Sequence, residues 1–471
     1  MKKKILGAAC IALFAYALSF ADTVSLTLDQ AVEYAMKNNR TLKSNDIDLA
    51  IKERAAKYSW NVFIPTVNVS GTMSRANEYN PSSKASGQMM SSMMGMISTL
   101  HPEALITIPS VKDDYDEEKD RWTPVGSLNV SLNLSLSYIY KMKAAKADYE
   151  AGKITWEQSQ NETIVSIKKL FYGLLLQQES LKIDKASLEN KRQRMVQAET
   201  NFRNGAIPRL SLLQTQVDYQ NTKPNVETAE QSLNQQLDTF AFLLGMPVGE
   251  DTIILDGSIE PTFVDVSSEN LIDQYRSNSL AIKGVEANID VLKLNLQTLN
   301  MAAWTPALAL SFTSTPAYIG SDKSDWLKDI GDRDKWYDSG TLSFTLAFNV
   351  TNLLPWSTNR QQAQDLQANI DKLNLTLETV KENYKLEVRQ AVDKLEQART
   401  KIESMTRNIT LAQEAYDATY RNYRNGMTEL LDLRDSETSL NQAKLGLLNQ
   451  KFEYISALLD LETKLNTKLT Q

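Results

Sequence analysis

Side chains suited to catalysis or to metal binding are scarce in this chain. Its 471 residues include one cysteine, Cys10, and one histidine, His101. A Cys/His metal site and a Ser–His or Cys–His catalytic pair are therefore nearly excluded by counting. The sequence also lacks a Walker loop, a dinucleotide-binding glycine fingerprint and a nucleophile elbow. We predict no enzymatic activity, no metal site and no cofactor.

Two carboxylates have a spacing that would let them act together on an ion. Asp432 and Asp435 lie three positions apart, so in a helix they share one face and could attract cations. The same spacing suits first-turn acids that stabilise a helix N-terminus by about 0.3–1 kcal/mol each. From spacing alone, this second interpretation is the stronger.

The segment from about residue 75 to residue 123 holds a second group of candidate ligands. Methionine thioethers suit Cu(I), but they also form pliable apolar patches, and we favour the patch. The segment is long for a connection without obvious regular structure, and its acidic run fits a solvated surface. The residues concerned are Met89, Met90, Met93, Met94, Met96, His101 and the acidic run 113–118.

The composition is typical of long helices. Glycine (17 residues) and proline (12 residues) are scarce, whereas Gln, Asn, Leu, Ala, Lys and Glu dominate. The net charge of −7 argues against a broad nucleic-acid-binding surface.

The beginning of the sequence has the features of a secretory signal peptide, which we place at residues 1–21. Lysines at positions 2–4 precede an apolar run over 5–14, and Ser19 and Ala21 are small residues suited to a cleavage site. An uncleaved anchor and a lipid-modified Cys10 are the alternatives. The apolar run is short for a bilayer helix, which needs about 20 residues.

Four stretches alternate apolar and polar residues with the period of two that strands require. They are predicted at about 65–74, 126–140, 306–315 and 340–350. Each is about ten residues long, the length of a tilted strand that crosses a bilayer. The hydroxyl-rich face suits a wet lumen, although an ordinary sandwich strand is an alternative. Aromatic residues suited to a membrane interface flank the stretches on the helix side: Trp60, Phe63, Tyr138, Tyr140, Trp304 and Trp356.

Four strands cannot close a membrane barrel, whose lower limit is about eight. Open sheet edges are not tolerated in lipid, so several copies must share the barrel. Two copies would give eight strands and three would give twelve. The four-strand pattern excludes a functional monomer, but it does not determine how many copies form the barrel.

The helices predicted between the strands have two lengths. Residues 141–203 and 357–424 are long helices, the second with a nearly unbroken heptad seam. The shorter helices are predicted at about 28–61, 210–244, 268–303 and 430–467.

The order of elements repeats once along the chain. Residues 201–205, Asn-Phe-Arg-Asn-Gly, correspond to residues 422–426, Asn-Tyr-Arg-Asn-Gly. We expect a first repeat over 22–244, a linker over 245–267 and a second repeat over 268–471. Each repeat consists of a short helix, a strand, a loop, a strand, a long helix, a glycine turn and a short helix.

Three features of the sequence resemble those of the outer-membrane efflux protein family, the TolC-like exit ducts. They are the duplication, the prolines Pro65 and Pro306 at strand starts, and the Tyr-Arg-Asn-Gly turn followed by Leu-Leu-Asp-Leu-Arg-Asp at 430–435. The resemblance covers nearly all of the mature chain. It implies a mainly α fold with a small transmembrane β part. A homotrimer would form an α-helical barrel and a shared 12-stranded β-barrel, with four strands from each chain.

The resemblance also implies a location, a function and partners. The β-barrel would lie in outer-membrane lipid, with a long periplasmic extension. The duct would serve a tripartite efflux or type I secretion system, together with a periplasmic adaptor (membrane fusion protein) and an inner-membrane transporter. The adaptor would dock around 190–225 and 410–445. An ungated passive channel and a periplasmic coiled-coil scaffold remain as alternatives, and the cargo is not indicated.

The same resemblance assigns roles at the periplasmic tip. The tip turns would lie at 204–209 and 425–429, where Gly205 and Gly426 supply the left-handed helix stop. Asp432 and Asp435 would line a cation-attracting aperture.

A further implication of the resemblance concerns the latch that closes the tip. Tyr423 matches the tyrosine of the family's latch, but the positions of the family's arginine and aspartate are Thr428 and Ser211. We therefore expect a neutral latch, or one rewired through Arg209 or Arg424.

Overall fold

The computed structural model describes most of the chain as two compact units. Unit 1 comprises Met1–Arg54, Ala147–Asp290 and Asp371–Gln471, and unit 2 comprises Ala55–Lys146 and Val291–Ile370. Each predicted repeat contributes segments to both units. The described residues are 23–77, 89, 92, 93, 96, 97, 99, 122–249, 252–319 and 326–470.

Several sequence predictions fall outside these described residues. They concern the signal peptide at 1–21 with Cys10, and, in the segment 75–123, Met90, Met94, His101 and the acidic run 113–118.

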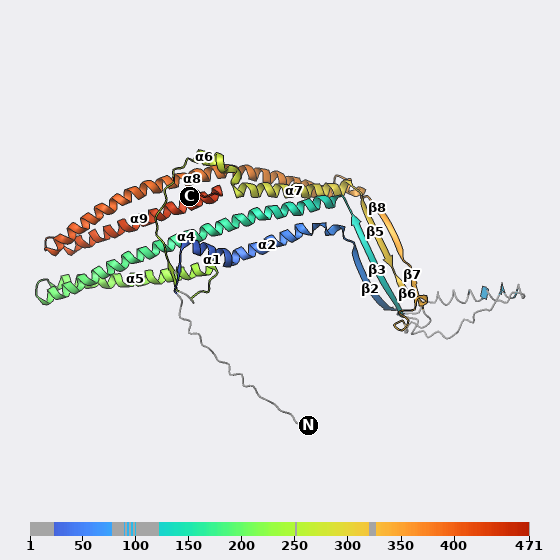
Figure 1. The fold of residues 1–471 in the computed structure, drawn as a ribbon, viewed down its shortest axis with the longest axis horizontal. Helices are drawn as coiled ribbons and strands as arrows, with labels where there is room; N and C mark the ends of the chain where they lie inside the picture. Colours follow the sequence, from blue (N-terminus) through green and yellow to red (C-terminus); the bar gives the residue numbers. More distant parts are fainter. Residues whose placement is uncertain are drawn as a thin grey trace, which may run out of the picture. The chain divides into compact units, whose positions relative to one another are not determined.

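Unit 2 is built on an antiparallel sheet whose main strands follow the order β2–β3–β5–β8 (Figure 1). Two short strands, β6 and β7, extend the sheet on one side of β3. The strands are β2 (Thr66–Arg75), β3 (Trp122–Leu134), β5 (Ala307–Ser314), β6 (Pro316–Tyr318), β7 (Trp336–Asp338) and β8 (Thr341–Ala347).

The strand predicted at 126–140 differs from the structure at both ends. β3 begins at Trp122 and ends at Leu134, and residues 137–140 belong to helix α4. Ser135 Oγ accepts a hydrogen bond from the Ser137 backbone N–H at 3.2 Å, which turns the chain into the helix. The apolar alternation can run on through Tyr138 and Tyr140 because residues four positions apart share one face in a strand and in a helix alike.

The strand predicted at 340–350 also ends early. β8 stops at Ala347, and the short 3₁₀ helix η6 follows at Val350–Leu353. Asn349 Oδ1 accepts a hydrogen bond from the Thr351 N–H at 3.1 Å, so a side-chain cap ends the extended chain.

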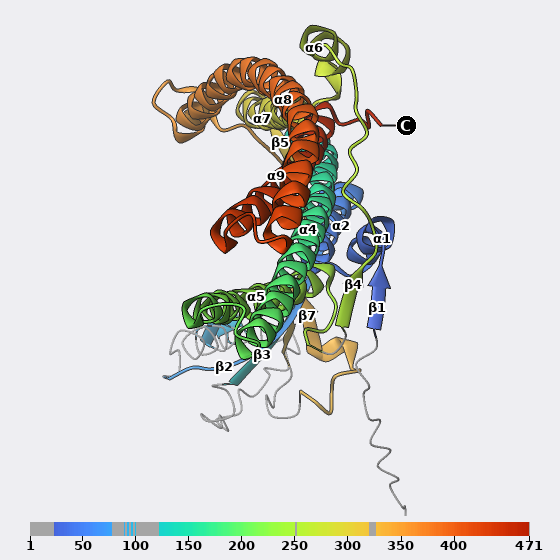
Figure 2. The same cartoon turned by 90° about the vertical axis from the view of Figure 1, so that its left-hand side faces the viewer.

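Two helical hairpins dominate unit 1 (Figures 1 and 2). Helices α4 and α8 each have 67 residues, and α5 and α9 each have 36. At 1.5 Å per residue, the long helices extend over about 100 Å. Their bounds are α4 (Ser137–Arg203), α5 (Arg209–Leu244), α8 (Thr358–Arg424) and α9 (Leu430–Leu465). No helix within the described ranges carries an apolar stretch that would span a bilayer.

The helices predicted at 28–61 and 268–303 are interrupted. The first divides into α1 (Leu28–Asn38), α2 (Arg40–Lys57) and the 3₁₀ helix η1 (Ser59–Phe63). The second divides into α6 (Ser268–Tyr275), the 3₁₀ helix η3 (Arg276–Asn278) and α7 (Leu280–Trp304).

Buried Asn39 accounts for the first of these breaks. Its Nδ2 donates to the Leu243 carbonyl at 2.7 Å, and its Oδ1 accepts from the Leu42 N–H at 3.0 Å. A tertiary contact with α5 therefore fixes the position where α1 ends.

The sequence analysis also missed a two-stranded parallel sheet in unit 1 (Figure 2). It pairs β1 (Thr23–Leu26) with β4 (Thr252–Leu255), which lies in the predicted linker. Leu26 and Ile253 join a core with Phe171, Leu174 and Phe240. A second core lies along α8 and α9, where Val388, Leu395, Tyr454 and Leu461 are buried.

Gly245 ends α5 at a point of close backbone approach. Its φ is +83°, and a Cβ there would lie 2.4 Å from the Asn38 carbonyl oxygen. Gly249 has a similar φ of +79°, but a Cβ there would meet nothing within 4 Å.

We predict that Gly245→Ala lowers thermal stability far more than Gly249→Ala. Both variants carry the left-handed strain, about 1–2 kcal/mol, and only Gly245→Ala adds the clash with α1. Circular dichroism melting of the detergent-solubilised protein would measure the difference. Equal melting temperatures would show that α1 does not approach Gly245 closely.

Candidate functional site

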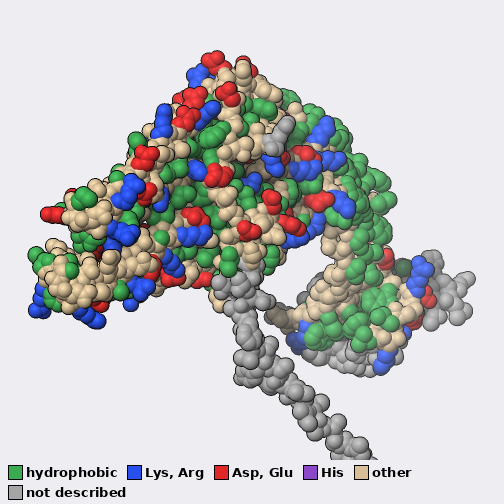
Figure 3. All heavy atoms as spheres, turned by 60° about the vertical axis from the view of Figure 1, so that its left-hand side comes forward, with side chains coloured by type: hydrophobic (Ala, Val, Ile, Leu, Met, Phe, Trp, Pro, Cys, Tyr) green, Lys and Arg blue, Asp and Glu red, His purple; other side chains and the backbone are tan. Residues whose placement is uncertain are grey.

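The sheet of unit 2 has one apolar and one polar face. The register places Val67, Val130, Phe312 and Leu342 side by side on the apolar face. These side chains have no cover within the described chain, and Val69 and Leu346 on the same face are 78% and 71% exposed. Figure 3 shows hydrophobic side chains gathered over this part of the molecule.

The other face of the sheet carries hydroxyl and amide groups. Ser131 pairs with Ser311 and Ser311 with Ser343, and the Oγ atoms of Ser311 and Ser343 lie 2.6 Å apart. Asn68 pairs with Asn129 on this face. A sheet with one apolar and one hydroxyl face is suited to separate lipid from water.

The two outer edges of this sheet are unpaired within the described residues. β2 pairs only with β3, and β8 pairs only with β5. All ten residues of β2 are exposed. Because unpaired backbone groups are not tolerated in lipid, other chains must complete the sheet if it enters a membrane.

The aromatic residues predicted for a membrane interface lie next to the strand ends. Trp60, Phe63, Trp304 and Trp356 are exposed. Tyr138 and Tyr140 are partly buried in the first turn of α4, and the rings of Tyr138 and Phe63 meet edge to face at 6.2 Å.

At the far ends of the hairpins in unit 1, both predicted glycine turns form as expected. Gly205 and Gly426 have φ values of +70° and +71°. The Ala206 N–H donates to the Asn201 carbonyl at 2.8 Å, and the Met427 N–H donates to the Asn422 carbonyl at 2.9 Å. These bonds satisfy the last carbonyls of α4 and α8.

Asp432 and Asp435 lie at the start of α9 and are both exposed. Asp432 Oδ2 accepts a hydrogen bond from Thr428 Oγ1 at 3.4 Å, and Asp435 Oδ1 lies 3.9 Å from Arg434 Nε. The first-turn position of Asp432 fits the helix-stabilising interpretation, and the exposure of both carboxylates leaves them available to ions.

A groove of about 1130 Å³ lies between the α4–α5 and α8–α9 hairpin ends (Figure 3). The aromatic part of its wall is a ladder on α8, where Tyr416 and Tyr420 stack at 6.1 Å. Of the residues predicted for the tip, the groove brings together Ser211, Tyr423, Arg424, Gly426 and Thr428. Gly205, Arg209, Asp432 and Asp435 are not among its lining residues.

A buried ion pair that the sequence analysis missed lies beside the groove, with Arg194 among the lining residues. Arg194 of α4 binds Glu437 of α9, and their side chains are only 11% and 6% exposed. Asn190 Nδ2 donates to the same carboxylate at 3.2 Å. Burial, together with the negative charge of Glu437, raises the pKa of the Tyr416 hydroxyl.

One signal in the sequence could have identified Glu437. It lies between Leu433 and Leu440, at a core position of the apolar seam of α9. A charged residue in such a seam requires a buried partner, but nothing in the sequence points to Arg194.

Most of the chain resembles known channels. The sequence profile of the outer membrane efflux protein family matches residues 31–246 and 271–467. The chain belongs to this family. It is therefore an outer-membrane channel protein with a long periplasmic helical extension, and not an enzyme. Members of the family are trimeric channels that work with adaptors and inner-membrane pumps.

Individual relatives match most of the chain. Nodulation protein T of Rhizobium leguminosarum bv. trifolii is 23% identical over 361 residues, which cover 72% of this chain and 71% of the relative. The CmeC outer membrane channel of Campylobacter jejuni is 15% identical, with a TM-score of 0.71 over 94% of this chain and 87% of that chain. The MtrE outer membrane channel of Neisseria gonorrhoeae, solved in an open state, is 16% identical, with a TM-score of 0.66 over 94% and 89%.

These solved structures confirm the predicted fold class, in which an α-helical barrel is joined to a β-barrel. We assign the apolar face of the sheet to lipid and the serine face to the lumen.

We predict that Phe344→Lys, on the same apolar face in the middle of β8, reduces the amount of folded protein in the outer membrane, whereas Ser343→Lys does not. A lysine on the lipid face costs about 2–4 kcal/mol at mid-bilayer depth, while a lumen-facing lysine remains hydrated. Heat-modifiable mobility of membrane fractions on gels would measure folding. Equal yields from the two variants would contradict the assignment of the faces.

Proposed function

We propose that this protein is the exit duct of a tripartite efflux or type I secretion system, with a periplasmic tip that opens and closes. Three copies would carry substrates from an inner-membrane pump and a periplasmic adaptor to the exterior. The observation that carries the proposal is the buried Arg194–Glu437 pair, which ties the two hairpin ends together. An ungated passive channel has no need of such a tie.

The proposed trimer follows from the open sheet and the family. Four strands with two free edges need partners, and three copies give a twelve-stranded barrel, wide enough to leave a channel. β2 of one copy would pair with β8 of the next.

The proposed latch replaces the ion pair that Thr428 and Ser211 cannot form. Within the chain, Arg194 and Glu437 connect α4 to α9. Arg209 is exposed and has no ion pair among the described residues. Near it, the α4–α5 turn carries arginines, whereas the start of α9 carries Glu429, Asp432 and Asp435. We infer that Arg209 binds these acids of a neighbouring copy, which would add a link between copies.

The proposed adaptor site is the groove between the hairpin ends. Leu210, Leu213 and Val217 line the groove and are 65%, 45% and 56% exposed. Their i, i+3, i+7 spacing forms a stripe that suits the apolar face of a partner helix. The periplasmic adaptor is the partner for which we propose this stripe.

We predict that Glu437→Gln opens the tip. The change leaves Arg194 buried without a counter-charge, which weakens a buried pair by about 3–5 kcal/mol. Planar-bilayer conductance should rise several-fold over the small conductance expected of the closed wild type.

Two controls accompany this experiment. Glu414→Gln removes an exposed acid of α8 that has no part in the proposed latch, and it should leave the conductance unchanged. The double variant Arg194→Glu with Glu437→Arg should restore low conductance. A wild-type channel that is already wide open, or a Glu437→Gln channel no wider than wild type, would favour the passive channel.

We further predict that Asp432→Asn with Asp435→Asn weakens cation preference and block by multivalent cations. Six carboxylates of a trimer would otherwise surround a narrow axis. The matched control is Asp393→Asn with Glu396→Gln, exposed acids at the same spacing on α8. Reversal potentials in a salt gradient measure selectivity, and an unchanged value in the first variant would refute the aperture ring.

A further inference from the structure

The helix-side ends of the four main strands carry basic residues and no acids. We call this region the basic margin and define it as residues 55–64, 135–146, 299–306 and 348–362. The whole chain has 51 basic and 58 acidic residues, yet these four segments contain no Asp or Glu. The basic residues of the margin are Lys57, Lys141, Lys143, Lys146 and Arg360.

The four segments lie at one edge of the sheet. Thr66 pairs with Ser131, Leu134 with Leu308, and Ala307 with Ala347, so each segment adjoins a strand end on the same side. The basic margin therefore begins where the apolar face of the sheet ends.

The charges of the basic margin have no acidic partners within the described chain. All five basic side chains are exposed, and none forms an ion pair with a described residue. Lys57 and Lys143 instead lie over the rings of Tyr58 and Tyr140, at 5.6 and 5.2 Å from the ring centroids. The four segments hold five positive charges and no acid of their own, so an anion from outside the chain can supply the counter-charge.

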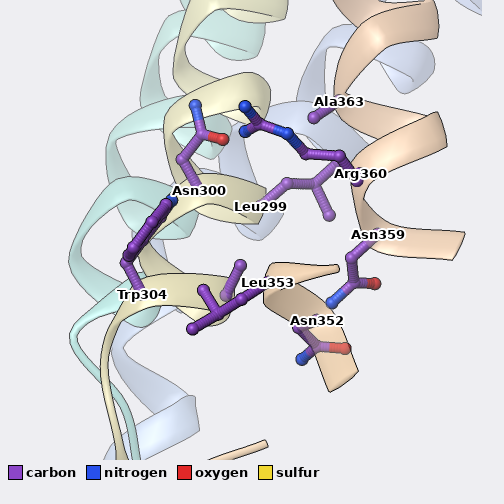
Figure 4. Close-up of a pocket in the computed structure, with 9 residues that line it drawn as sticks. Leu299, Asn300, Trp304, Asn352, Leu353, Asn359, Arg360 and Ala363 are labelled. Carbon is purple, nitrogen blue, oxygen red and sulfur yellow. The ribbon is translucent and has the colours of Figure 1, made fainter. Parts of the chain in front are cut away.

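Arg360 borders a small hollow with room for about one water molecule, and at its mouth the Arg360 charge could meet one such anion (Figure 4). The hollow is lined by Asn300 and Trp304 of α7 and by Asn352, Asn359 and Arg360 around the start of α8. In Figure 4 the guanidinium group of Arg360 lies beside Asn300. The three carboxamides form no side-chain hydrogen bond with any residue that the structure describes.

Ser357 fixes the backbone beneath this hollow. Its Oγ accepts from the Arg360 N–H at 3.3 Å and donates to the Asn352 carbonyl at 3.1 Å. The guanidinium therefore projects from an ordered helix start, while its charge stays free for a bidentate contact.

The surroundings of the basic margin indicate which anion it meets. Trp304 and Trp356 are 61% and 72% exposed, and tryptophan is enriched at the depth of lipid headgroups. The margin lies on the helix side of the strands, and the helical extension of this family is periplasmic. The anions at that depth are the phosphates of glycerophospholipids in the periplasmic leaflet.

We propose that the basic margin is a binding site for anionic glycerophospholipids, with one lipid phosphate held at the Arg360 hollow. Lys57, Lys141, Lys143 and Lys146 attract further headgroups, and the flanking tryptophans contact the upper acyl chains. The lipid sets the depth of the sheet in the membrane. The proposal uses the outer-membrane location and is independent of gating and of the export partner.

The test uses the full-length trimer in neutral detergent with added phosphatidylglycerol or phosphatidylcholine, and native mass spectrometry counts the bound lipids. The margin variant combines Lys57→Gln, Lys141→Gln, Lys143→Gln, Lys146→Gln and Arg360→Gln. The control variant combines Lys43→Gln, Lys372→Gln, Lys394→Gln, Lys401→Gln and Arg407→Gln, which are exposed and have no ion pair among the described residues.

We expect the wild type and the control variant to retain phosphatidylglycerol about tenfold better than phosphatidylcholine, since each basic residue near a headgroup adds to anionic lipid affinity. The margin variant should show a ratio of about one, and Arg360→Gln alone should lose the most tightly held lipid. An unchanged ratio in the margin variant would overturn the proposal. Displacement of the lipid by inorganic phosphate at equal concentration would also overturn it, because it would indicate a site for free phosphate.

Discussion

Backbone hydrogen bonding in lipid is the constraint on which this molecule depends. The outer edges of β2 and β8 carry N–H and C=O groups with no partner among the described residues, and hydrocarbon supplies none. A single chain thus forms a curved sheet with a fixed strand register and with one apolar and one polar face. Its two outer edges are unpaired among the described residues. The sheet can therefore enter the membrane only when other copies of the chain pair with its edges.

The helical end meets the opposite condition, since it is surrounded by water. There the helices satisfy their own backbone groups, so association and separation of the hairpins depend on side chains. One buried ion pair, a tyrosine ladder and a polar groove lie between the hairpin ends. Contacts of this kind have few alternative geometries, because a buried charge without its partner is costly. In the β part, the strands of different copies cannot separate in lipid. In the α part, water can replace the side-chain contacts between the hairpins.

Much of this arrangement could be predicted from the sequence, and the exceptions have physical causes. The alternation around Val130 and Phe344 located the strands, and the glycine turns at Gly205 and Gly426 ended the long helices as predicted. The alternation predicts a strand through Tyr138 and Tyr140, which lie in α4, because residues four positions apart share one face in both structures. The break at Asn39 depends on a carbonyl of α5 about two hundred positions away. Arg194 and Glu437 belong to different predicted repeats, so only the assembled hairpins reveal that they meet.

The parallel pairing of β1 with β4 has a consequence for the order of events in biogenesis. Thr23 pairs with Thr252, so the leading strand of an exported chain finds its partner only after half of the polypeptide has crossed the inner membrane. Until then the backbone N–H and C=O groups of β1 lack the strand that pairs with them here. The two-stranded sheet can therefore form only after the chain has been exported as far as Leu255.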